Sequence, residues 1–317
     1  MVTEVIIAPT EVQNGPAHRP NRNHPKGLES GLCKIGPPRM PLRIVQSKQN
    51  PRLKELRRSL AYGRREAGAP VGIEGPNLLE EVLRAGIGIQ CVFAAQGAER
   101  LLDGLKLSPE AEVLLLPKDV LASALATETP QLVAALINPP EWSWADVLGD
   151  CRGQEALIVV LAGLQDPGNL GTILRSAEAF GATGVIALQG TVSEWNPKAV
   201  RASAGSIFRL PVITAEVEEC FGRLRAAGVG SLTTAGSATT AAGEADMSGP
   251  VALIIGNEGN GVPAQVAAQA DGAIAIPCPG PVESLNAAVA ASVLLYEASR
   301  QRAALRIKGS NRRREIQ

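Results

Sequence analysis

Histidine is almost absent from the sequence, and its absence limits the possible chemistry. The only two histidines among 317 residues, His18 and His24, lie in an N-terminal stretch rich in proline and asparagine. A Ser-His-Asp triad, a Cys-His pair or a histidine-ligated metal in the folded part of the chain is therefore nearly excluded. The five cysteines are scattered and no two have CxxC spacing. We therefore expect neither a metal site nor a disulfide framework, and a reducing cytoplasm fits best.

Aromatic residues and long apolar runs are also scarce. Aromatics make up 3% of the chain and hydrophobic residues 45%, so the core must be built from Ala, Val, Leu and Ile. No apolar run approaches the roughly 18 residues that a membrane-spanning helix needs. The first residues lack the basic and then apolar pattern of a secretory signal. We therefore expect no membrane partner.

The net charge of zero conceals an uneven distribution. Residues 1–71 contain 13 Lys+Arg and 5 Asp+Glu, and residues 300–317 contain 7 and 1. The stretch between them, 72–299, contains 11 basic and 25 acidic residues. Basic ends on an acidic body indicate contact with a polyanion, although two solvated basic tails would give the same distribution.

The pattern of the chain predicts two α/β units. Residues 1–40 show no periodicity, which is typical of a disordered tail. Strand and helix patterns then alternate over 41–139, and residues 140–153 interrupt them and indicate a linker. From 154 to 308, apolar strands alternate with helices, which predicts a parallel sheet with helices on both faces. A basic tail follows at 309–317.

The predicted helix over 51–67 carries most of the basic charge of the first unit. Asn50 and Pro51 provide a cap and a first helical position, and leucines form an apolar stripe behind them. Basic side chains crowd the remaining surface: Lys54, Arg57, Arg58, Arg64 and Arg65. A basic platform poor in aromatics suits phosphate contacts with structured RNA, and a solvated helix face is the alternative.

Three polar clusters each follow a predicted buried strand. They are "DPGNLGTILRSAEAFG" (166–181), "GNEGNG" (256–261) and "IPCPGPVESLNAAVAAS" (276–292). Ligands bind at the carboxyl ends of parallel strands, so the three clusters are expected at one site. Each also has an ordinary structural explanation, because Asn169 and Ser284 could be N-caps, Arg175 a surface residue, and the glycines turn residues. "GNEGNG" has neither the spacing of a dinucleotide fingerprint nor the Lys-Ser/Thr of a P-loop, which argues against a Rossmann oxidoreductase.

The three clusters, in this order and spacing, resemble the motifs of the SpoU/TrmH family of RNA ribose 2′-O-methyltransferases. The resemblance extends to "NPKAVRASAGSIFRLPV" at 196–212. The segments "QSKQNPRLKELRRS" and "EGPNLLEE" resemble the family's N-terminal substrate-binding domain, similar to a ribosomal-protein-type RNA-binding fold. One departure is "VGIEG", where the family usually has an aromatic residue before the glycine-acid pair. The resemblance implies an α/β fold whose parallel sheet ends in a C-terminal trefoil knot, one of the rare exceptions to unknotted topology.

The family resemblance also implies S-adenosylmethionine as cofactor and no metal. The cofactor would contact backbone groups of Gly256, Ile276 and Leu285, with Asn257 and Gly259 in the same loop. The family works as a homodimer, in which the partner's first motif completes the site.

The resemblance assigns Arg175 to the ribose hydroxyl and its neighbouring phosphate. Asn169, Glu258, Ser284 and Asn286 would arrange the site. Because a guanidinium stays protonated in proteins, we expect Arg175 to clamp the phosphate and stabilise the developing alkoxide, with Glu258 orienting it.

The expected function is therefore a cytoplasmic RNA 2′-O-ribose methyltransferase. Ribosomal RNA is favoured as substrate, since a separate substrate domain is more usual in the family's rRNA enzymes. The alternatives are the same chemistry on tRNA and a non-catalytic RNA-binding assembly factor. The presence of both Arg175 and Asn286 argues against the non-catalytic alternative.

Overall fold

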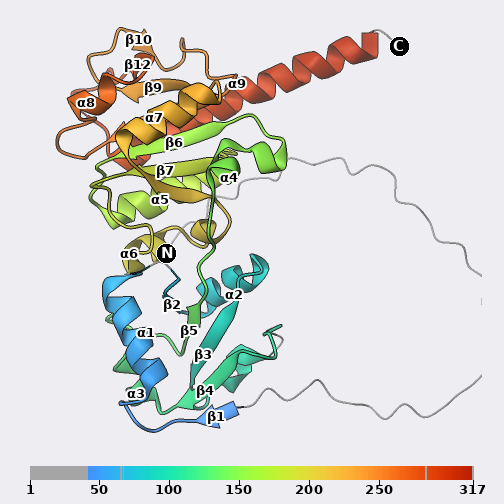
Figure 1. The fold of residues 1–317 in the computed structure, drawn as a ribbon, viewed down its shortest axis with the longest axis vertical. Helices are drawn as coiled ribbons and strands as arrows, with labels where there is room; N and C mark the ends of the chain where they lie inside the picture. The colour runs from blue at the N-terminus through green and yellow to red at the C-terminus, as the bar shows by residue number, and fades with distance from the viewer. Residues whose placement is uncertain (1–41, 65, 67, 104, 283, 316–317) are drawn as a thin grey trace, which may run out of the picture. The chain divides into compact units, whose positions relative to one another are not determined.

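The computed structural model describes residues 42–64, 66, 68–103, 105–282 and 284–315, with side chains up to Leu305. The tail predicted at 1–40 and the predicted RNA contact Arg65 lie outside these residues. Two α/β units follow one another along the described chain, and each of them, a sheet together with its helices, is called a layer (Figure 1).

The first layer is built on a mixed five-stranded sheet in the order β1-β4-β3-β5-β2. β3 runs parallel to β4 and antiparallel to β5, which in turn pairs antiparallel with β2. The sequence patterns did not predict β1 or β5, although β5 is buried along its whole length. The strands are β1 (Leu42–Ile44), β2 (Val71–Glu74), β3 (Ile89–Ala95), β4 (Glu112–Leu116) and β5 (Val133–Ile137).

The basic helix of this layer, α1 (Pro51–Tyr62), begins as predicted and ends earlier. The Asn50 side chain accepts a hydrogen bond from the Leu53 amide, and the leucine stripe is buried. The helix stops at Gly63, which has φ +72° and lies so close to Trp195 that a Cβ would be 2.7 Å from its carbonyl oxygen. The other helical segments of the layer are α2 (Pro76–Arg84), the 3₁₀ turn η1 (Glu99–Leu102) and α3 (Lys118–Ala122).

The segment predicted as a linker, 140–153, contains regular structure. It holds α4 (Trp144–Leu148) and the 3₁₀ turn η2 (Asp150–Arg152). Ser143 and Asp146 form a capping box, in which the Asp146 carboxylate accepts the Ser143 amide at 2.8 Å. Val147 is fully buried against the second sheet. The predicted linker thus contains a short helix, because one buried side chain and a local cap stabilise an element too short to show periodicity.

The second layer is a seven-stranded sheet in the order β10-β12-β9-β11-β6-β7-β8, and every neighbouring pair is parallel. The predicted parallel sheet is thus confirmed. The central strands β6 and β11 are buried throughout. The strands are β6 (Leu157–Ala162), β7 (Gly184–Leu188), β8 (Val212–Ala215), β9 (Gly230–Thr234), β10 (Thr240–Ala241), β11 (Val251–Gly256) and β12 (Gly272–Ala275).

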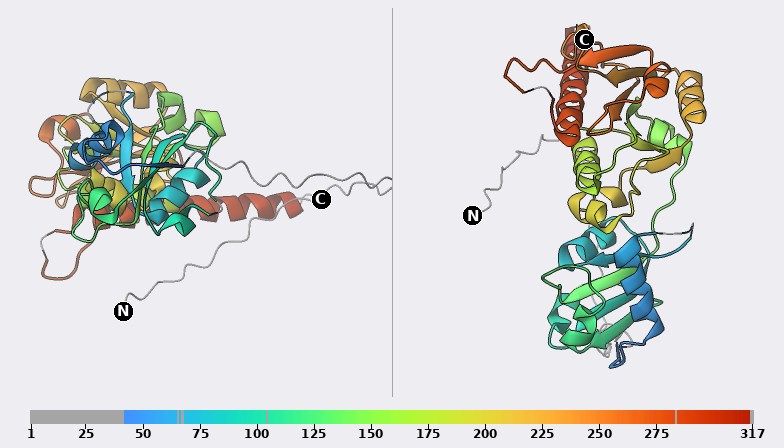
Figure 2. Two further views of the ribbon diagram at one scale, coloured as in Figure 1. Left: turned by 90° about the horizontal axis from the view of Figure 1, so that it is seen from below. Right: turned by 90° about the vertical axis from the view of Figure 1, so that its left-hand side faces the viewer.

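Helices cover both faces of this sheet (Figure 2). Leu157, Val159 and Leu161 belong to the core that contains α5 and α9, whereas Ile158 and Val160 pack with α7. This alternation follows the two-residue period of a strand. The helical segments are α5 (Pro167–Ala179), α6 (Pro197–Ala202), η3 (Ser206–Phe208), α7 (Val217–Ala226), α8 (Ala264–Ala267) and α9 (Ala287–Glu315).

The final helix is longer than the sequence patterns predicted. Residues 309–315, expected as a basic tail, continue α9, which extends past the sheet (Figure 1). Among the described residues, no helix is both long and apolar enough to span a membrane.

Candidate active site

The first polar cluster begins at the carboxyl end of β6, where Asp166 caps α5. Its carboxylate accepts the Gly168 amide at 2.7 Å and the Lys198 ammonium at 3.0 Å. The hydrogen bond from Lys198 is the main cause that lowers the pKa of Asp166. Because Asp166 satisfies the helix end, the neighbouring Asn169 is not the N-cap and its side chain is available for other contacts.

The second cluster is a tight turn that closes over the end of β11. Asn257 and Gly261 exchange backbone hydrogen bonds of 2.9 and 3.0 Å. The Asn257 side chain accepts the Gly259 amide at 2.8 Å and donates to the Gly163 carbonyl at 2.9 Å. The turn is therefore anchored to the loop after β6, and Glu258 lies next to the start of α5.

A chain of hydrogen bonds joins all three clusters. The Asn286 amide donates to Asn169 Oδ1 at 3.0 Å, and the Asn169 amide donates to Glu258 Oε1 at 3.0 Å. Asn286 is also the cap of α9, since its Oδ1 accepts the Ala288 amide at 2.9 Å. The expectation that the clusters meet at one edge of the sheet is thus confirmed.

The Glu258 carboxylate is held in its charged form. Burial alone would raise its pKa, but the hydrogen bonds from Asn169 and from the backbone amides of Gln165 and Asp166 outweigh this and lower the pKa. A carboxylate with a lowered pKa is a weak proton acceptor at neutral pH. The geometry therefore suits Glu258 to orienting Asn169.

A cavity of about 490 Å³ adjoins this chain of hydrogen bonds, and all five predicted cofactor residues line it. Two predicted catalytic residues, Glu258 and Ser284, line it as well. No sequence pattern had singled out Thr234, Ala235 and Gly236, which also line it after β9. One feature of the sequence could have indicated them, since Gly236 follows β9, a strand of the same parallel sheet. The predicted cofactor residues in the lining are Gly256, Asn257, Gly259, Ile276 and Leu285.

The cavity fits an adenosyl cofactor in size and in lining. Its volume lies within the range of ligand pockets, roughly 300–1,000 Å³. Gly256 has no room for a side chain, since a Cβ would be 2.1 Å from the Gly261 carbonyl carbon. The backbone of the 256–261 turn therefore borders the cavity directly, where its N–H and C=O groups can contact a ligand.

Arg175 lies on the exposed side of α5, one turn beyond Thr172. Within the described part of the chain it makes no hydrogen bond or ion pair. Within this chain the Glu258 carboxylate accepts hydrogen bonds from Asn169 and two backbone amides and makes none with Arg175. The guanidinium is thus available to an anion from outside this chain.

The basic face of α1 is smaller than its sequence implied. Lys54 and Arg58 are exposed and make no ion pair with any described residue. Arg57 donates to the Ser123 carbonyl at 3.2 Å. The Arg64 side chain is only 16% exposed and pairs with Glu141 at 3.5 Å.

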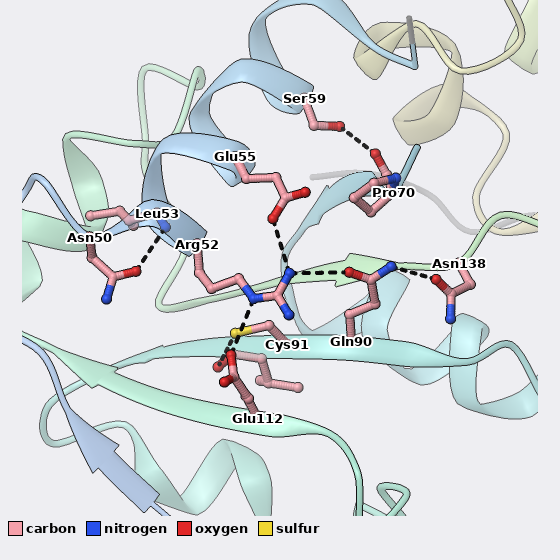
Figure 3. Close-up of polar contacts among 11 residues, drawn as sticks. Asn50, Arg52, Leu53, Glu55, Ser59, Pro70, Gln90, Cys91, Glu112 and Asn138 are labelled. Atoms are coloured by element: carbon pink, nitrogen blue, oxygen red, sulfur yellow. Dashed lines mark hydrogen bonds and ion pairs between the residues drawn. The ribbon is translucent and has the colours of Figure 1, made fainter. Parts of the chain in front are cut away.

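Arg52, a further basic residue of α1, is neutralised within the layer (Figure 3). Its guanidinium contacts Glu55 at 3.1 Å, Glu112 at 3.2 Å and Gln90 at 3.4 Å. The hydrogen bond to Glu55 is the main cause that raises its pKa. The outward charge of α1 therefore comes from Lys54 and Arg58, together with Arg57, whose only partner among the described residues is the uncharged Ser123.

Comparison with known families identifies the chain. The family model described as "SpoU rRNA Methylase family" matches residues 156–296, and the model "RNA 2'-O ribose methyltransferase substrate binding" matches residues 73–143. The chain belongs to the SpoU family. The resemblance stated from the sequence motifs is thus confirmed, and the chain is an S-adenosylmethionine-dependent RNA methyltransferase of that family.

Several SpoU relatives align along most of the chain. The 23S rRNA (guanosine(2553)-2'-O)-methyltransferase RlmP of Bacillus subtilis is 32% identical over 255 residues, which are 80% of this chain and 98% of RlmP. The AdoMet-bound rRNA methyltransferase from Sinorhizobium meliloti has a TM-score of 0.71 and 32% identity, covering 82% of this chain and 98% of that structure. The SpoU methyltransferase AviRb from Streptomyces viridochromogenes, in complex with AdoMet, has a TM-score of 0.69 and 29% identity, covering 80% and 99%.

Among the residues that the structure describes, no group of three or more His, Cys, Asp or Glu side chains could hold a metal ion.

Proposed function

We propose that the chain methylates a ribose 2′-hydroxyl of ribosomal RNA. The observation that carries the proposal is the chain of hydrogen bonds from Asn286 through Asn169 to Glu258, which ends at the cavity suited to the cofactor. The substrate-binding model over 73–143 and the 23S rRNA activity named for the Bacillus relative favour ribosomal RNA.

The cofactor supplies a methyl group activated on a sulfonium. The backbone groups of Gly256, Ile276 and Leu285 would hold it in the cavity that they line. Positioning is then the main task of the protein, since aligned reactants need little further activation.

Arg175 is proposed as the residue that holds the RNA at the reacting ribose. Its unpaired guanidinium can grip a phosphate with two parallel hydrogen bonds and stabilise the negative charge that develops on the 2′-oxygen. The hydroxyl proton leaves to water, because neither the guanidinium nor the ionised, hydrogen-bonded Glu258 is a ready acceptor. Asn169 and Ser284 would position the ribose.

We also propose that the enzyme is a homodimer that pairs through α9 and α5. Val289, Val293 and Tyr296 are 49%, 39% and 56% exposed on one side of α9. With Phe180, the residue that follows α5, they line an apolar groove of about 320 Å³. Because Thr172 also lines this groove, the partner would lie within one helical turn of Arg175. This placement supports a site completed by a second copy.

The homodimer is tested by sedimentation at micromolar concentration. The wild type should sediment as a dimer and Val293→Glu as a folded monomer, because the new charge would be buried at the contact. Leu305→Glu, at an apolar side chain that is 52% exposed farther along α9, is the matched control and should stay dimeric. A wild type that sediments as a monomer would overturn the proposal.

Two further features are proposed. A C-terminal trefoil knot agrees with the strand order β12-β9-β11-β6 and with the packing of α9 against α5 and β11. A cytoplasmic location agrees with four free cysteines among the described residues.

The function is tested on total RNA from a deletion strain of the source organism. Mapping of 2′-O-methyl groups should show one ribosomal site lost in the deletion strain and restored by the wild-type gene. Asn169→Ala, which breaks the hydrogen-bond chain while Asp166 still caps α5, should fail to restore it. Loss of a tRNA methyl group instead would move the substrate to tRNA, and an unchanged map would refute the proposal.

A further inference from the structure

A second cavity, of about 760 Å³, lies beside the first turn of α2. It shares no lining residue with the cofactor cavity. Its volume is in the range of small-ligand pockets, roughly 300–1,000 Å³. Most side chains that line it are polar or charged: Glu74, Asn77, Glu80, Glu81, Thr127, Gln131 and Arg201.

Glu74 gives this cavity an unusual chemical feature. The side chain is only 6% exposed, and its Oε1 accepts hydrogen bonds from the Thr127 hydroxyl and from the backbone amide of Gln131. Its Oε2 is buried and has no hydrogen-bond partner among the described residues. A buried carboxylate oxygen without a donor is costly, so such an atom points to a donor supplied by a ligand.

Arg201 and the start of α2 provide positive potential at the same cavity. Arg201 is exposed and has no hydrogen-bond or ion-pair partner among the described residues. No side chain caps α2, whose N-cap is Gly75, so the first amides of that helix are open to an anion. Ala204, which also lines the cavity, has φ +48°, a strained value for alanine.

The acidic side chains do not form a cation site. Glu81 is already paired with Arg84 and with Arg209, which also binds Glu178 bidentately. One free carboxylate oxygen and one unpaired guanidinium on the lining of the same cavity match a ligand with an N–H donor at one end and a negative charge at the other. A nucleotide has this combination.

We propose that this cavity binds one unpaired guanine nucleotide of the RNA substrate. Glu74 accepts from the Watson–Crick edge of the base, while Arg201 and the start of α2 hold the adjacent phosphate. The two lone pairs of the one free oxygen can accept both adjacent N–H donors on that edge of guanine, and unpaired bases are the usual targets of sequence-specific RNA recognition. The inference rests on the proposed RNA methyltransferase function.

The test measures binding of the full chain to two short oligoadenylates by fluorescence anisotropy. One carries a central guanosine and the other a central inosine, which lacks the exocyclic amine. The wild type should bind the guanosine probe about tenfold more tightly. Glu74→Gln should remove this preference, because the amide presents N–H groups to the base in place of the free oxygen.

Glu80→Gln is the matched control, since it removes the same charge from an exposed position in the same cavity. It should keep the preference for guanosine. Arg201→Ala should weaken binding of both probes equally and reduce the salt slope by about one. Equal binding of the two probes by the wild type, or a preference that survives in Glu74→Gln, would overturn the inference.

Two further measurements separate the possible failures. The thermal midpoint and S-adenosylmethionine affinity of Glu74→Gln should match the wild type. If that variant does not fold, the wild-type comparison of guanosine with inosine and the Arg201→Ala variant still decide the question. A wild type that methylates ribosomal RNA without a guanosine preference would overturn only this inference, whereas absence of methylation would overturn the proposed function.

Discussion

Gly256→Ala gives the sharpest test of the cofactor cavity. The added Cβ would lie 2.1 Å from the Gly261 carbonyl carbon and 2.2 Å from the Val262 nitrogen. Both are backbone atoms, so the 257–261 turn must move by about 1 Å. Overpacking of this kind typically costs about 1–3 kcal/mol. Where all of this cost falls on the cofactor-binding shape of the turn, the dissociation constant for S-adenosylmethionine rises roughly 5- to 150-fold.

Isothermal titration with S-adenosylmethionine measures the effect, and the thermal midpoint shows whether the variant folds. Gly249→Ala is the control, since its Cβ would meet nothing within 4 Å and this glycine does not line the cofactor cavity. It should bind nearly as the wild type does. Wild-type affinity in a folded Gly256→Ala protein would show that the turn does not shape the cofactor site.

Three further outcomes are expected. Arg175→Ala should lower methyl transfer at least about a hundredfold with cofactor affinity unchanged in calorimetry, since Arg175 does not line the cofactor cavity; near-normal turnover would contradict its role. S-adenosylmethionine should protect Cys278, which lines that cavity, from alkylation, while the exposed Cys151 stays reactive; peptide mass mapping measures both, and equal labelling of Cys278 with and without cofactor would show that the cofactor binds elsewhere. Neutralising Lys54 and Arg58 together should weaken RNA binding and flatten its salt slope by about two; an unchanged slope would place RNA elsewhere.

The pattern of apolar and polar residues in the sequence was enough to predict much of the second layer, which holds the candidate active site. Buried strands that alternate with helices leave a parallel sheet as the main solution, and polar residues after such strands must gather at one edge. Asn169, Glu258 and Asn286 meet there as predicted. The glycines of "GNEGNG", interpreted from the sequence as possible turn residues, do lie in a tight turn that leaves no room for a Cβ at Gly256.

Short elements depended on contacts from distant parts of the chain. β5 is only five residues long and apolar throughout, so it has no period to detect, and it forms because β2 and β3 pair with it on either side. α4 needed one buried valine and one capping box. The strand pairing and the burial of the valine are not visible in a window of sequence, whereas the capping box of Ser143 and Asp146 is a local pattern.

Only the tertiary structure decided which polar groups are free. Arg52 and Arg64 look like the other basic residues of α1 in sequence, but carboxylates brought from elsewhere in the chain neutralise them. In sequence Glu74 is an ordinary strand end, but in the structure its buried Oε2 has no donor among the described residues. A residue type states which bonds a side chain can make, whereas folding determines which of those bonds are already made and which remain for a ligand.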